Sequence, residues 1–134
     1  MNFNVREEAK NWYDGALVDL EEARSALANG RYNWALFAAH QAVEKALKAA
    51  FMVLKRARAP RTHDLVRLMG ELGLEVPDEL KVKVSELSPY YTVASYPNAG
   101  LTRPWEGISK GTAERLVEAA ERLVRLIGEE AGLG

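Results

Sequence analysis

Apolar residues recur every three or four positions along most of the chain, which is the spacing of one face of an α-helix. The pattern predicts a first helix over about residues 5–28. It ends at Asn29-Gly30, because both residues tolerate the left-handed backbone of a helix C-terminus. A second helix is predicted over about residues 32–56. It is apolar on nearly every side, so we expect it to be buried by more than one neighbour.

Two further helices are predicted after the second one. Thr62 looks like the N-cap of a short helix that Gly73 closes. Pro77 suits the first position of a longer helix, which reaches about Tyr90. The segment 81–84 alternates like a strand, but the sequence offers no second strand to pair with it, so helix is the better prediction.

The last third of the chain combines a loop with one long helix. Pro and Gly residues make 92–109 irregular, and a loop of that length in so small a protein is often functional. An apolar face then predicts a helix over about 110–130. The whole pattern predicts an all-α fold, an antiparallel up-and-down helical bundle of four main helices plus one short helix. We expect it to form a single domain over residues 1–134.

Composition narrows the classes of protein that the chain can represent. Without cysteine there is no disulfide, thiolate nucleophile or cysteine zinc site. The apolar runs are too short for a membrane span, and the charged N-terminus does not resemble a signal peptide. A net charge of −1 argues against a dedicated duplex-binding protein, so nucleic-acid contacts would need a local patch. We expect a cytoplasmic protein with no metal, cofactor or membrane partner, and the Arg-rich composition fits a thermophilic source.

A narrow polar stripe interrupts the apolar second helix. Gln41, Glu44, Lys45 and Lys48 recur at spacings of three and four, so they share a face. Charges among apolar neighbours must pair or face a cavity, so the stripe could form a pocket or a dimer seam that holds a phosphate or nucleotide. The alternative is a solvated strip with a weak Glu44–Lys48 ion pair.

Two histidines and a basic run are the other candidates for chemistry. His40 and His63 could exchange protons near pH 7, or serve packing and helix-start hydrogen bonds. Neither has the cluster of acidic residues that a metal site needs. Arg58 and Arg61 belong to a basic run that could contact RNA phosphates or solubilise a helix end. Aromatic residues around the long loop could stack on bases or close the end of the bundle. They are Tyr90, Tyr91, Tyr96 and Trp105.

Several pieces of the sequence together resemble the HEPN family (higher eukaryotes and prokaryotes nucleotide-binding domain). Residues 12–13 (Trp-Tyr) look like its first helix, and residues 62–65 (Thr-His-Asp-Leu) are similar to its short third helix. Tyr96, Pro97 and Asn98 fall where the family often has an Arg-Tyr-Pro-Asp-like turn. The longest match is to the second-helix signature. It consists of Gly30, Arg31, Tyr32, Ala35, Phe37, Ala38, Gln41, Ala42, Glu44, Lys45, Ala46, Leu47 and Lys48.

The resemblance implies a helical bundle that commonly dimerises and often pairs with a nucleotidyltransferase-fold protein in a toxin–antitoxin-like module. Many members are metal-independent RNases, and others are non-catalytic nucleotide- or RNA-binding modules. The RNases use an Arg and a His, separated by four to six residues, in the second half of the domain, where this chain has no His. Arg58 and His63 have that spacing but lie in an earlier loop.

We therefore expect a homodimeric nucleotide- or RNA-binding or interaction module, possible partners being a nucleotide, an RNA and a nucleotidyltransferase-fold protein. The residues expected to bind the ligand are Gln41, Glu44, Lys45, Lys48, Tyr96, Pro97 and Asn98. One alternative is an RNase toxin, with His40 or His63 as general base and Arg58 or Arg61 holding phosphate charge. A second alternative is a structural bundle with no ligand.

Overall fold

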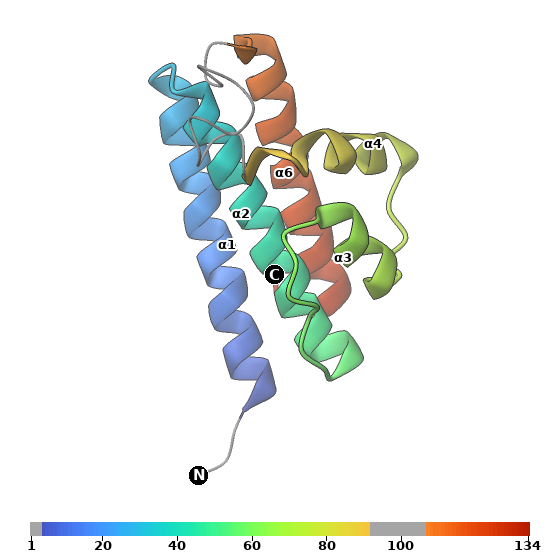
Figure 1. The fold of residues 1–134 in the computed structure, drawn as a ribbon. Helices are drawn as coiled ribbons and strands as arrows, with labels where there is room; N and C mark the ends of the chain where they lie inside the picture. The colour runs from blue at the N-terminus through green and yellow to red at the C-terminus, as the bar shows by residue number, and fades with distance from the viewer. Residues whose placement is uncertain (1–3, 92–106) are drawn as a thin grey trace.

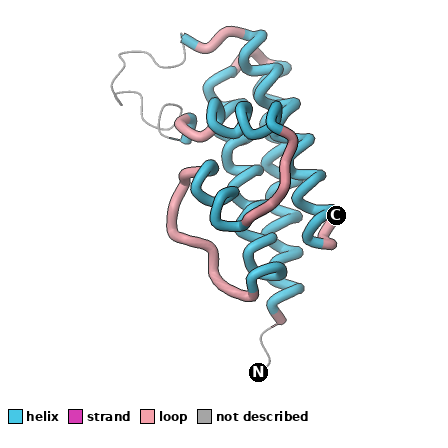
Figure 2. The backbone as a smooth tube through the Cα atoms, turned by 90° about the vertical axis from the view of Figure 1, so that its right-hand side faces the viewer, coloured by secondary structure: helices cyan, strands magenta, loops and turns pink. Residues whose placement is uncertain are grey.

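Three long helices lie side by side in a computed structural model of the chain, which describes residues 4–91 and 107–134 (Figure 1). They are α1 (Val5–Ala28), α2 (Tyr32–Ala50) and α6 (Lys110–Ala131). Two shorter helices, α3 (Leu65–Leu72) and α4 (Asp78–Leu87), lie on one side of them (Figures 1 and 2). No strand occurs within the described ranges. The all-α helical bundle predicted from the sequence is confirmed.

The core forms where α1, α2 and α6 meet. Small residues on α1 let its neighbours approach closely, and the buried positions follow the three-four spacing of one face. They are Ala9, Tyr13, Ala16, Leu20 and Ala23. The α2 helix packs against α1, α6 and α3, which explains why it is apolar on nearly every side. Its apolar residues are therefore covered largely within one chain.

Side-chain contacts fix the direction of α1 against α6. The Tyr13 hydroxyl donates to the Val124 carbonyl at 3.0 Å, within the core. Nearer the other end of α1, Arg24 pairs with Glu121, 2.6 Å separating Nε from Oε1. Arg6 reaches the carbonyl of Gly132 at 2.6 Å. Residues further along α1 contact residues earlier in α6, so the two helices are antiparallel.

Three helix ends differ from the sequence predictions. The N-cap of α3 is Asp64 and not Thr62, because the Asp64 carboxylate accepts from the Arg67 backbone N–H. The threonine hydroxyl accepts instead from the N–H of Asp64, at 3.0 Å. Pro77 is the N-cap of α4, and that helix ends at Leu87 rather than at Tyr90.

The second helix also ends differently from the prediction. After Ala50 it continues as a π-helical turn, η1 (Phe51–Lys55). Arg56 then takes a left-handed backbone conformation with φ 51°, which stops the helix one residue before the predicted end. The chain crosses from there to α3 as an irregular segment, 56–64, whose His63 contacts His40 and Glu44 in the middle of α2.

Most of the predicted loop lies outside the described residues. This applies to the ligand-binding candidates Tyr96, Pro97 and Asn98 and to the aromatic candidate Trp105. Tyr90 and Tyr91 are described, and both are half-buried. Among the described residues, no helix is both long enough and apolar enough to span a membrane.

Candidate functional site

The polar stripe of α2 divides between two neighbouring sites. Gln41 and Lys45 line a hollow between α1 and α2. Glu44 instead contacts the irregular segment before α3, where His63 lies. Helical geometry explains the division, because consecutive residues are separated by about 100° around the axis and Glu44 and Lys45 therefore border opposite sides of the stripe.

Glu44 is the buried centre of a cluster of polar side chains. Its side chain is only 8% exposed, and its Oε2 accepts from Lys48 Nζ at 2.9 Å. Its Oε1 lies 2.8 Å from Nδ1 of His63 and 3.8 Å from Nδ1 of His40. The Glu44–Lys48 pair considered from the sequence is thus present. It is part-buried and belongs to this cluster rather than to a solvated strip.

The two histidines tie the irregular segment to α2. His40 is fully enclosed, and its Nε2 donates to the His63 carbonyl at 2.9 Å, since a carbonyl only accepts. Its neutral ring therefore keeps the lone pair on Nδ1. The His63 ring stacks on Tyr91, with centroids 4.6 Å apart. Burial lowers the pKa of His40 below its ordinary value, outweighing the opposite effect of the Glu44 carboxylate.

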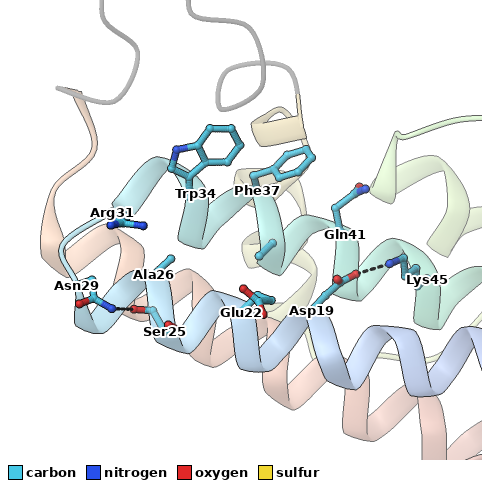
Figure 3. A pocket seen from close by; sticks show the side chains of 11 residues that line it. Asp19, Glu22, Ser25, Ala26, Asn29, Arg31, Trp34, Phe37, Gln41 and Lys45 are labelled. Carbon is cyan, nitrogen blue, oxygen red and sulfur yellow. Dashed lines mark hydrogen bonds and ion pairs between the residues drawn. The ribbon is translucent and has the colours of Figure 1, made fainter.

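A hollow of about 480 Å³ lies between α1 and α2 near the turn that joins them (Figure 3). We call it the α1–α2 hollow. Trp34 and Phe37 meet edge to face on its α2 side, with ring centroids 5.9 Å apart. Lys45 crosses to α1 and pairs with Asp19 at 2.8 Å. The remaining polar lining residues are Glu22, Ser25, Asn29, Arg31 and Gln41.

Most of this hollow was not predicted from the sequence. Trp34 lies on the helix that was expected to be buried by more than one neighbour, but its side chain is 49% exposed. A signal was present, because Trp34, Phe37, Gln41 and Lys45 recur at spacings of three and four and so share one face with the predicted stripe. The lining residues on α1 gave no such signal, because their place beside α2 depends on how the two helices pack.

A second hollow, of about 320 Å³, lies between the first part of α1, the end of α2 and the irregular segment. We call it the arginine hollow, because Arg58 and Arg61 line it. Lys48, Trp12 and Glu8 contribute from the two helices. The structure thus places Arg58 and Arg61 of the predicted basic run beside Lys48 of the polar stripe.

Comparison with known proteins agrees with this architecture. A family model for the HEPN domain matches residues 9–130. The chain belongs to the HEPN family. A search of curated protein sequences gives no match.

Solved structures of similar proteins include other HEPN proteins. A HEPN domain protein from Thermotoga maritima is 35% identical, with a TM-score of 0.72, and the match covers 91% of this chain and 98% of that one. A protein from Thermus thermophilus is 30% identical, with a TM-score of 0.79 and coverage of 90% and 96%. An archaeal HEPN homologue is 26% identical, with a TM-score of 0.75 and coverage of 92% and 97%.

The catalytic candidates of this HEPN chain differ in exposure and in whether they line a hollow. His40 is enclosed, so it does not reach a ligand in this conformation. His63 is 52% exposed, and the Glu44 carboxylate holds its Nδ1, which is how a general base is oriented. Arg58 and Arg61 line the arginine hollow, whereas His63 does not. His63 is therefore the one histidine within a single chain whose side chain is exposed.

Proposed function

We propose that this HEPN chain is a single-domain binding module for nucleotides or RNA, and that the α1–α2 hollow holds the base. The exposed Trp34 ring supports this assignment, because aromatic side chains stack on bases without needing a particular sequence. Phe37 packs against that ring nearly at a right angle. The Gln41 amide carries both donors and an acceptor for the edge of a base.

The charges around the α1–α2 hollow suit a base better than a phosphate. Lys45 and Asp19 neutralise each other across the two helices. Arg31 and Glu22 remain as one positive and one negative side chain. A nearly neutral, aromatic and amide-lined hollow offers stacking and hydrogen bonds but little attraction for an isolated anion.

Truncating Trp34 tests this proposal. We expect Trp34→Ala to weaken the binding of ribonucleoside 5′-monophosphates about tenfold, because base stacking on an aromatic ring is worth about 1–3 kcal/mol. Isothermal titration calorimetry measures the affinity, and the control is Val82→Ala, which shortens another exposed apolar side chain, on α4. Unchanged affinity in Trp34→Ala would show that the base does not bind in this hollow.

We also propose that the protein forms a homodimer in the cytoplasm and partners a nucleotidyltransferase-fold protein in a toxin–antitoxin-like module. Family membership supports this proposal. We expect light scattering coupled to size exclusion to give twice the 14.9 kDa chain mass, or a stable complex with a nucleotidyltransferase encoded next to it. A protein that stays monomeric at high concentration and forms no complex with that nucleotidyltransferase would contradict both the homodimer and the partner proposal.

A further inference from the structure

The two hollows lie in line on one face of the α1–α2 pair. Their lining residues on each helix recur mainly at spacings of three and four, as neighbours on one face must. Those on α1 include Glu8, Trp12, Asp19, Glu22 and Ala26. Those on α2 and the turn after it include Ala38, Gln41, Lys45, Lys48 and Met52.

Gly15 and Lys45 lie between the two hollows. Gly15 follows Trp12 of the arginine hollow and precedes Asp19 of the α1–α2 hollow on the same face of α1. A Cβ at Gly15 would lie 3.5 Å from the Lys45 side chain. The lysine therefore lies across a position where α1 carries no side chain, and its ion pair with Asp19 holds it there.

The hollows differ in charge. In the arginine hollow, Arg58 and Arg61 are exposed and form no ion pair with any described residue. Lys48 is engaged by Glu44, so the carboxylate of Glu8 is the one negative group set against two unpaired guanidinium groups. Unpaired arginines bind phosphate oxygens through two parallel hydrogen bonds. Trp12, which is 38% exposed, adds an aromatic surface at the same place.

We propose that one single-stranded RNA segment occupies both hollows, with a base in the α1–α2 hollow and backbone phosphates at Arg58 and Arg61. This inference rests on the proposed function and adds where the strand runs. Trp12 and Asp19 are the nearest lining residues of the two hollows on α1 and lie seven residues apart, so about 10 Å of helix separates the hollows. A stacked strand advances roughly 3.4 Å per nucleotide, so about four nucleotides are needed to reach both.

Strand length is the first variable of the test. The probes are fluorescein-labelled RNAs of two and eight nucleotides, and fluorescence anisotropy measures their affinities at several salt concentrations. We expect the octamer to bind at least tenfold more tightly than the dinucleotide, because only the octamer reaches both hollows.

The arginines are the second variable. We expect the double variant Arg58→Ala/Arg61→Ala to weaken octamer binding about tenfold and to lower the slope of log affinity against log salt by about 1.4, since each lost phosphate contact on a single strand removes about 0.7. The affinity for nucleoside monophosphates should stay within twofold of the wild type. The matched control is Lys110→Ala/Arg115→Ala, which removes two exposed cations from the start of α6.

Each contrary result has a distinct meaning. Suppose that nucleoside monophosphates bind, but the octamer binds no more tightly than the dinucleotide and its affinity is the same in the arginine variant. The inference is then overturned while the proposed function stands. If neither monophosphates nor octamer bind, both fail. If the arginine change alters the mass measured by light scattering and leaves RNA affinity unchanged, this face contacts a second copy of the chain, and the inference is wrong.

Discussion

Replacing Gly128 with alanine will lower the free energy of unfolding by about 2 kcal/mol, because a methyl group there would overlap the Tyr13 ring. Tyr13 is buried, and its hydroxyl donates to the Val124 carbonyl, so the ring cannot move without losing that bond and its packing. Gly128 also lies inside α6, where alanine by itself would favour the helix by about 1 kcal/mol. The expected loss is the net of these two effects.

Thermal unfolding followed by circular dichroism measures this prediction. A loss of about 2 kcal/mol lowers the melting temperature by roughly 6 °C in a chain of this size. The control is Gly70→Ala in α3, where a Cβ meets no atom within 4 Å and which we expect to be neutral or stabilising. Adding Tyr13→Leu to Gly128→Ala should make the glycine change nearly neutral. If both glycine variants melt alike, the close approach of Tyr13 to α6 does not limit stability.

Stability will fall as the pH is lowered from 7 to 5, and His40 will account for much of that fall. The unfolded chain binds a proton at His40 near pH 6.5, whereas burial gives the folded chain a lower pKa at this residue. The unfolded state therefore binds more protons below about pH 6.5. Each unit of pH in that window costs up to about 1.4 kcal/mol, until the folded ring also becomes protonated.

The matched comparison is between the wild type and His40→Gln, whose amide can still donate to the His63 carbonyl. Urea unfolding at pH 7, 6 and 5 gives the free energy of unfolding for each protein. We expect the variant to lose less stability than the wild type across this range, even if it is less stable at pH 7. Parallel pH profiles for the two proteins would show that His40 takes up its proton as easily in the folded chain as in the unfolded one.

The helices and their bundle could be predicted because apolar residues recur every three or four positions along each of them, which defines the buried face. Helix ends were harder to predict. Thr62 and Asp64 are both good N-cap residues, and the choice of Asp64 depends on a turn in which the threonine hydroxyl accepts from the Asp64 N–H. The π-helical turn after Ala50 was not predicted, because the apolar spacing there is compatible with a continued α-helix.

The candidate site could be predicted only on one helix. The spacing of Gln41, Glu44, Lys45 and Lys48 correctly placed them on one face of α2, but it could not show that this face borders two different sites. The partners that distinguish them come from elsewhere in the chain: Asp19 for Lys45, and His63 for Glu44. Contacts across such sequence separations depend on the assembled fold.

The measurement that tests the proposed function most directly is an NMR titration of the wild-type protein with ribonucleoside 5′-monophosphates. Gln41 is the only glutamine in the chain, so its side-chain amide gives a distinctive pair of signals. We expect that pair and the Trp34 indole N–H to shift together and saturably, while the N–H signals of α4 stay in place. If neither signal moves at millimolar nucleotide, the α1–α2 hollow does not bind nucleotides, and this HEPN chain is better described as a bundle that acts through protein partners alone.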